Sequence, residues 1–194
     1  MFADIKTALR PAIVLTLLFA LLLGILYPLA LTGIGQLAFS DQANGSLLRD
    51  AKGNVIGSSL IAQGFTGDQY FHPRPSAAGK GYEANNSYGS NLGPASQALA
   101  DRVKADIAAN QEKAPGQSVP ADLVTASASG LDPHISPEAA FYQVPRVARA
   151  RGHSEAQIHA AVEAAIEHPL LGFLGEPRVN VLLLNRRLDA TSPK

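Results

Sequence analysis

The chain has 194 residues, and its 16 Lys and Arg residues balance 16 Asp and Glu residues at a formal net charge of zero. No bulk positive charge is available to attract nucleic acid, so a DNA or RNA partner is not expected. The sequence contains no cysteine, which excludes disulfide bonds and thiolate metal sites.

The first predicted element is a transmembrane helix. No charged residue occurs between positions 11 and 40. A helix over 11–31 would rise about 1.5 Å per residue and so cross a hydrocarbon core of about 30 Å. The alternative is a cleaved signal peptide, but its apolar region is usually shorter, and Tyr27 and Pro28 interrupt the place where cleavage would occur. We therefore expect a retained anchor.

Positive charge on one side of the span predicts its orientation. Lys6 and Arg10 precede the span, and the next basic residue is Arg49. Positively charged flanks are retained in the cytoplasm. The predicted organisation is a cytoplasmic N-terminus at 1–10, a transmembrane helix at 11–31, a connector at 32–45 and an extracytoplasmic α+β domain at 46–194.

Small side chains recur at every fourth position of the span and form one ridge along it. Such ridges let helices approach closely in lipid, where the hydrophobic effect does not drive association. We expect this ridge to dock against another membrane helix, and its members are Ala12, Thr16, Ala20 and Gly24.

Two segments without helical periodicity follow. Residues 46–61 form two apolar arms around the turn residues 50–54, which predicts a β-hairpin. Residues 63–94 are rich in Gly, Pro, Asn and Ser but also in aromatic residues, which disordered linkers lack. We interpret this segment as an ordered surface loop that faces a partner, in which prolines hold His72 and Arg74 outward. The residues expected to face the partner are Tyr70, Phe71, His72, Arg74, Tyr82, Tyr88 and Asn91.

A helix is predicted from about Pro94 to Gln111, followed by a short strand at 123–125. Apolar residues recur at intervals of four on one ridge of this helix, while the charged residues Asp101, Arg102, Lys104 and Asp106 are expected in water. The ridge consists of Ala95, Leu99, Val103 and Ile107.

The C-terminal part is predicted to contain two helices and one strand. Ser136 is a suitable N-cap, Pro145 should break the helix that follows, Gly152 should close it and Ser154 should open the next. The apolar run 179–185 predicts a buried strand. Helices and strands that do not alternate as βαβ units predict an α+β domain.

Four side chains of the types used by hydrolases lie close together in the sequence: Ser129, Asp132, His134 and Ser136. A membrane-anchored hydrolase is therefore one alternative. Triad members are brought together by the fold, however, not by adjacency in sequence, and Ser136 is already explained as a helix cap.

Other chemical motifs are weak, and neither a catalytic nor a metal-binding residue is assigned. Glu155, His159 and Glu163 share a helix face, which more often is a solvated face than a metal site. The sequence at 79–81 lacks the Ser or Thr that a phosphate-binding loop requires after its lysine. The arginines between 146 and 151 are typical of a DNA-reading helix only if the domain is basic, which this one is not.

Five motifs in order give the chain a specific resemblance to the C subunit of the Kdp potassium-transporting ATPase. The resemblance extends over nearly the whole chain, including the single N-terminal span. The motifs are GSSLIAQ at 57–63, YFHPRPSA at 70–77, GSNLGP at 89–94, DLVTASASGLDPHISP at 122–137 and LGEPRVNV at 174–181.

This resemblance implies a non-catalytic subunit of a bacterial high-affinity potassium importer in the inner membrane. Its implied partners are a channel-like potassium-translocating subunit, a P-type ATPase catalytic subunit and a small membrane subunit. The family's C subunit is described as a chaperone-like factor that raises the ATP affinity of the catalytic subunit. No phosphate-binding motif occurs here, so we expect the complex, not this chain, to handle ATP and potassium.

Three functions therefore remain to be compared. In the preferred hypothesis the outer domain caps the channel-like subunit while the span docks by its small ridge. The alternatives are the anchored hydrolase and a free-standing ligand-binding module on an anchor.

Overall fold

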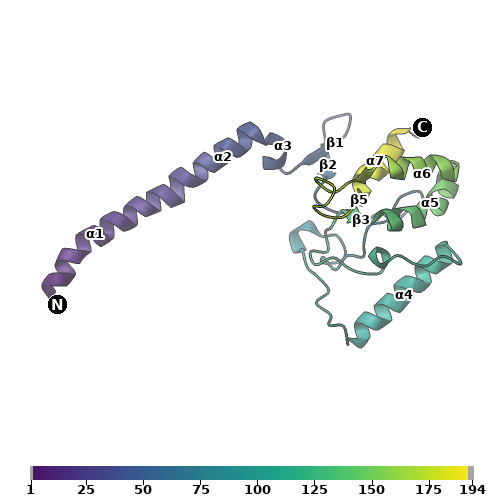
Figure 1. Cartoon of the computed structure of the whole chain (residues 1–194), viewed down its shortest axis with the longest axis horizontal. Coiled ribbons are helices and arrows are strands. Elements are labelled where there is room, and N and C mark those ends of the chain that lie inside the picture. Colours follow the sequence, from purple (N-terminus) through teal and green to yellow (C-terminus); the bar gives the residue numbers. More distant parts are fainter. Residues whose placement is uncertain (1, 192–194) are drawn as a thin grey trace. The chain divides into compact units, whose positions relative to one another are not determined.

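The structure of the chain is a computed structural model, and it describes residues 2–191. The chain divides into two compact units, Met1–Ile56 and Gly57–Lys194 (Figure 1).

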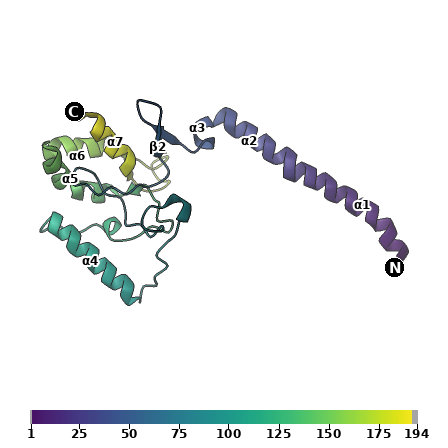
Figure 2. The ribbon, with the colours of Figure 1, turned by 180° about the vertical axis from the view of Figure 1, so that it is seen from behind.

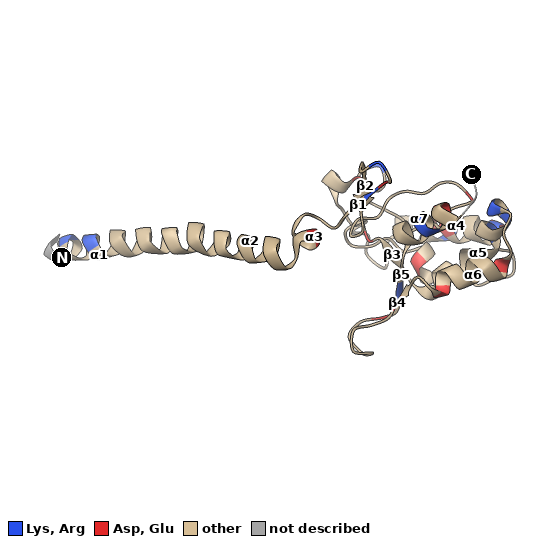
Figure 3. Cartoon of the chain, turned by 90° about the horizontal axis from the view of Figure 1, so that it is seen from above, with Lys and Arg blue, Asp and Glu red and all other residues tan. Residues whose placement is uncertain are grey.

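The N-terminal unit consists mainly of one long apolar helix. It comprises α1 (Phe2–Leu21), the π-helical segment η1 (Leu22–Leu26) and α2 (Tyr27–Ala38), and a short helix α3 (Ser40–Ala43) follows. Residues Asp4–Ala38 are long and apolar enough to cross a membrane. Figure 3 shows basic residues at the N-terminal end of this helix and no charged residue again before α3. The helix continues to Ala38, into the segment 32–45 that is predicted as a connector.

The π-helical segment lies just before a proline. The N–H of Tyr27 donates to the carbonyl of Leu22, one residue further back than in an α-helix. Pro28 has no N–H, and in a regular α-helix its ring would clash with the carbonyl of Gly24. The wider turn accommodates the proline without ending the helix.

The predicted hairpin is confirmed. Strands β1 (Leu47–Arg49) and β2 (Val55–Ser58) form a two-stranded sheet. Asp50 closes the turn, since its Oδ1 accepts hydrogen bonds of 2.8 Å from the backbone N–H groups of Lys52 and Asn54.

The C-terminal unit begins with a long, mostly irregular segment whose one helical turn among the described residues is η2 (Ala84–Asn86). Helix α4 (Gln97–Lys113) follows and is capped by Ser96, so it begins three residues after the predicted start at Pro94. In Figures 1 and 2, α4 lies apart from the other helices of this unit. Asp101 and Lys104 are exposed as predicted, whereas Arg102 and Asp106 are partly buried, with side chains 30% and 32% exposed.

The strand predicted at 123–125 is also wrong, because residues Ala121–Leu123 form the 3-10 helix η3. The backbone N–H and the hydroxyl of Thr125 both bond to the carbonyl of Ala121, at 3.0 and 2.8 Å. These local bonds close a helical turn and take the groups that a strand would need.

The sheet of this unit has three short antiparallel strands in the order β3 (His134–Ile135), β5 (Arg178–Asn180) and β4 (Ile166–Glu167). His134 pairs with Asn180, and Ile166 pairs with Val179. The central strand is therefore contributed by the last part of the chain.

Helix α5 (Pro137–Arg151) begins and ends as predicted. Ser136 Oγ accepts from the N–H of Ala139 at 3.2 Å, and Gly152 ends the helix in the left-handed conformation. The prediction that Pro145 breaks it is wrong, since the helix is continuous. Burial of Val144 and Val147 on both sides of the proline offsets the roughly 3 kcal/mol that an internal proline costs.

Two further helices complete the unit. Helix α6 (Glu155–Glu163) starts with the predicted cap at Ser154, which forms a capping box with Gln157. Helix α7 (Val181–Thr191) replaces most of the strand predicted at 179–185. Asn180 caps α7 by accepting from the N–H of Leu183 at 3.1 Å, and the buried residues that follow lie at helical spacing.

The core lies between α5, α6, α7 and the sheet. Its fully buried large side chains include Phe71, Ile135, Ile158, Val179 and Leu184. Helices and an antiparallel sheet that share this core confirm the α+β class.

Candidate functional site

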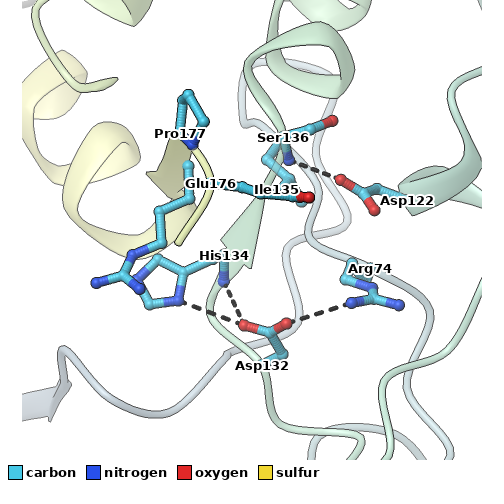
Figure 4. A pocket seen from close by; sticks show the side chains of 9 residues that line it. Arg74, Asp122, Asp132, His134, Ile135, Ser136, Glu176 and Pro177 are labelled. Carbon is cyan, nitrogen blue, oxygen red and sulfur yellow. Dashed lines mark hydrogen bonds and ion pairs between the residues drawn. The ribbon is translucent and has the colours of Figure 1, made fainter. Parts of the chain in front are cut away.

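A polar hollow of about 380 Å³ lies where the irregular segment meets β3 and the approach to β5. Figure 4 shows its side chains, which come from parts of the sequence that are far apart. Its charged and titratable residues are Arg74, Asp122, Asp132, His134, Glu176 and Arg178.

The carboxylate of Asp132 lies between the guanidinium of Arg74 and the imidazole of His134 in this hollow. Its Oδ2 is 3.4 Å from Nη1 of Arg74, and its Oδ1 is 3.4 Å from Nδ1 of His134 (Figure 4). The backbone N–H of His134 also donates to Oδ1 at 3.0 Å. Arg74 is held further by its Nε, which donates to the carbonyl of Thr125 at 3.3 Å.

The polar contacts continue from His134 across the sheet. Glu167 Oε2 lies 3.9 Å from Nε2 of His134 and accepts a 3.0 Å bond from Nε of Arg178. A series of contacts thus runs from Arg74 through Asp132, His134 and Glu167 to Arg178, and it links the irregular segment to all three strands. The side chain of Asp122 bonds to the backbone, because its Oδ2 accepts a hydrogen bond of 2.7 Å from the N–H of Ser136.

The expected partner-facing loop contains one residue that does not face outward. Phe71 has no exposed surface. Its N–H donates to Asn185 Oδ1 at 2.8 Å, and its carbonyl accepts from Asn185 Nδ2 at 2.9 Å. The expectation that Phe71 faces a partner is therefore corrected, because this side chain belongs to the core.

His72 is also turned toward its own domain. Its N–H donates to Gln143 Oε1 at 2.7 Å, and its Nε2 is 3.1 Å from the carbonyl of Gly67. Burial, with the nearby positive charge of Arg146, lowers the pKa of His72 to about 4. The proline-rich sequence fixes its backbone but does not hold its side chain out in water.

The remaining loop residues divide into supporting and exposed ones. Tyr82 donates from its hydroxyl to the carbonyl of Arg74 at 2.8 Å, and burial raises its pKa to about 12. The ring of Tyr70 lies under the guanidinium of Arg151, 5.3 Å from its centroid. Tyr88 and Asn91 are exposed, so they are the members of the set most available to a partner.

Residues 9–190 match the family model KdpC, described as "K+-transporting ATPase, c chain". The chain belongs to this family. It is 58% identical over 185 residues to "Potassium-transporting ATPase KdpC subunit" of Caulobacter vibrioides (strain NA1000 / CB15N), which covers 95% of this chain and 94% of that protein. The protein of that name from Koribacter versatilis (strain Ellin345) is 53% identical over 188 residues and 97% of both chains. The identification as a non-catalytic subunit of this transporter family is thereby confirmed.

The hydrolase alternative is not supported. Ser136 Oγ is occupied as the cap of α5, and Ser129 Oγ accepts from the N–H of Leu131 at 3.1 Å. Both ring nitrogens of His134 face carboxylates. Across residues 2–191 no hydrogen bond joins either serine hydroxyl to an imidazole, so the nucleophile and base of a triad are not assembled.

The residues considered for a metal site form a surface contact instead. His159 Nδ1 is 3.5 Å from Glu163, and its ring stacks on Phe141 with centroids 4.4 Å apart. Among the residues that the structure describes, no group of three or more His, Asp or Glu side chains is arranged to hold a metal.

The residues of the predicted ridge lie on the long N-terminal helix. Ala12, Thr16 and Ala20 are exposed on α1, and Gly24 lies in the π-helical segment. A Cβ atom added to Gly24 would meet nothing within 4 Å in the chain itself. A larger residue there would therefore meet no other part of this chain.

The sequence alone did not reveal which side chains connect the loop to the core. It also did not reveal which side chains connect the hollow to the sheet. Gln143, Asn180 and Asn185 are buried polar residues inside apolar helical or strand-like runs, and Glu167 and Arg178 extend the polar contacts of His134 across the sheet. A polar residue inside an apolar run is the available signal, but its partner is set by the fold.

Proposed function

We propose that the chain is the accessory subunit of an ATP-driven potassium import complex. It assembles with a channel-like potassium-translocating subunit, a P-type ATPase catalytic subunit and a small membrane subunit. The observation that carries this proposal is the family match over residues 9–190, which includes the apolar helix as well as the α+β unit.

In this proposal the long helix crosses the inner membrane with its N-terminus in the cytoplasm. Lys6 and Arg10 lie at the N-terminal end of a helix that carries no charged residue from position 11 to its end at Ala38, and this supports the orientation. The α+β unit then lies outside, where it caps the mouth of the channel-like subunit through exposed loop residues such as Tyr88 and Asn91.

ATP and potassium are handled by the partner subunits in this mechanism. The domain lies on the opposite side of the membrane from cytoplasmic ATP, so its support of ATP binding acts through the span or the partners. The ridge of Ala12, Thr16, Ala20 and Gly24 provides the contact within the membrane.

Two measurements test the proposal. The tagged chain should co-purify with the other subunits, and its deletion should abolish growth on limiting potassium and potassium-stimulated ATP hydrolysis. Purification as a stable monomer with normal potassium uptake in the deletion strain would refute an accessory role.

The topology is tested separately by labelling. The chain has no native cysteine, so Lys52→Cys in the exposed hairpin turn provides a single thiol in this subunit. A membrane-impermeant thiol reagent added to intact spheroplasts should modify it. Modification only in inverted vesicles would place the domain in the cytoplasm and allow direct contact with nucleotide.

A further inference from the structure

An apolar groove lies between α5 and α6, which are side by side in Figures 1 and 2. It is a hollow of about 390 Å³, and its apolar lining comes from Phe141, Val144 and Pro145 on α5 and from Ala156 and Ala160 on α6. Phe141 also lines a second hollow, of about 680 Å³, beside the first turn of α5. The two hollows that share this ring are called the Phe141 groove below. A groove between two helices can receive the apolar face of a third helix.

The border of the Phe141 groove is acidic. Glu155 and Glu163 line the first hollow, and Glu138 lines the second. Among the described residues that line either hollow, none is Lys or Arg, and neither Glu138 nor Glu155 forms an ion pair with another described residue. In the polar hollow, by contrast, Asp132 faces Arg74. Carboxylates without cations of their own favour an occupant that carries positive charge.

The spacing of these carboxylates along α6 matches the repeat of a helix. Glu155 and Glu163 are eight residues apart on one helix, which corresponds to about 12 Å along its axis. His159 lies between them, and its ring stacks on Phe141 with centroids 4.4 Å apart. The border is therefore acidic at both ends and aromatic in the middle. A complementary helix has Lys or Arg at two positions seven or eight residues apart, with apolar residues between them.

We propose that the Phe141 groove binds a basic amphipathic helix of another subunit of the potassium-transporting ATPase. Apolar side chains of that helix fill the space beside Phe141 and Pro145, while two basic side chains pair with Glu155 and Glu163. The inference rests on the proposed function, because only the assembled complex supplies this helix. The charge also argues against a lipid occupant, since carboxylates repel the anionic headgroups that attract proteins to membrane surfaces.

Photo-crosslinking in the assembled complex tests the occupant directly. A diazirine amino acid is incorporated at position 156 in the groove and, as the control, at position 105, because Ala156 and Ala105 are both exposed alanines on helices of the same unit. Illumination of membranes should join position 156, but not position 105, to a segment of another subunit that carries Lys or Arg. Peptide mass spectrometry identifies that segment.

The possible products separate failure of the inference from failure of the proposed function. A product with lipid, with a second copy of this chain or with a segment that lacks basic residues would overturn the inference. The same product from position 105, or no product in a complex that still co-purifies, would also overturn it. In all these cases the proposed function stands, whereas a wild-type chain that co-purifies with no other subunit would refute the proposed function itself.

Charge reversal measures the contribution of the acidic border to assembly. Glu155→Lys combined with Glu163→Lys should lower co-purification of the other subunits in mild detergent about tenfold, because like charges would then face each other. Asp101→Lys combined with Glu112→Lys makes the same change in net charge at exposed positions of α4 and should retain co-purification. Equal recovery with both variants would overturn the inference.

A milder pair of substitutions covers the case in which charge reversal unfolds the chain, which is recorded from the unfolding midpoint. Glu155→Gln combined with Glu163→Gln keeps the shape of both side chains and removes only their charge. This variant should lower co-purification about threefold, the effect expected for losing two ion pairs in contact with solvent. Wild-type recovery of a folded Gln variant would show that the acidic border does not hold a basic partner.

Discussion

Phe71 and Asn185 are joined by two hydrogen bonds between the backbone of one residue and the side-chain amide of the other. The N–H of Phe71 donates to Asn185 Oδ1 at 2.8 Å, and Asn185 Nδ2 donates to the carbonyl of Phe71 at 2.9 Å. Both residues are almost completely buried. The side chain of one asparagine on α7 therefore provides the hydrogen-bond partners for the buried backbone N–H and carbonyl of Phe71, which a neighbouring strand would otherwise provide.

Asn185→Leu should destabilise the chain strongly. The substitution leaves the N–H and the carbonyl of Phe71 buried without partners, and each such group costs about 1–3 kcal/mol. The measurement is chemical unfolding of the full chain in detergent micelles, followed by tyrosine fluorescence. Asn85→Leu in the exposed turn η2 is the control and should change the free energy of unfolding by less than about 0.5 kcal/mol. Equal midpoints for the two variants would contradict this role of Asn185.

Acidification should destabilise the domain through His72. Its folded-state pKa is about 4, below the unfolded value of 6.5, so the unfolded chain binds the proton more readily. Above about pH 6.5 the ring is neutral in both states and the free energy of unfolding keeps its full value. As the pH falls toward 4 the unfolded state takes up the proton first, so this free energy decreases. Since the ring is only partly buried, the loss should be about 1–2 kcal/mol after allowance for solvent screening.

The pH dependence is checked by unfolding at pH 7 and pH 4.5 in the wild type and in His72→Gln. The variant should lose less stability on acidification than the wild type does. His168→Gln changes an exposed histidine and should retain the wild-type loss. An identical loss in wild type and His72→Gln would assign the effect to other groups.

The pair formed by Arg74 and Asp132 should contribute little to stability. Their side chains are 25% and 32% exposed and 3.4 Å apart. Pairs in contact with solvent are worth about 0.2–1 kcal/mol. A double-mutant cycle with Arg74→Gln and Asp132→Asn measures this coupling energy. A value above about 2 kcal/mol would indicate that the hollow excludes water more fully than its geometry implies.

Larger side chains on the small ridge of the span should weaken assembly with the other subunits. Ala20→Leu with Gly24→Leu fills the ridge without adding polarity, so insertion should remain normal while co-purification with the other subunits falls. Val14→Leu with Leu18→Phe adds volume about 200° away around the helix and should be tolerated. Normal assembly of the Ala20 and Gly24 variant would exclude docking by the ridge.

The sequence by itself determined the features that depend on neighbouring residues. The uncharged span, the hairpin turn at Asp50, the caps at Ser136 and Ser154 and the helix end at Gly152 each follow from local hydropathy or local hydrogen bonding. The family resemblance also belongs to the sequence, because the order of its motifs identifies it without coordinates.

The tertiary structure decided the features that depend on distant partners. The apolar run 179–185 became a central strand followed by α7, because β3 and β4 pair with Arg178–Asn180 while Asn180 caps the helix. Pro145 remained inside α5 because packing offsets its missing hydrogen bond. Phe71 entered the core because Asn185, far away in sequence, satisfies its backbone. Burial and long-range hydrogen bonding override local preference in each case, and neither can be read from a residue's immediate neighbours.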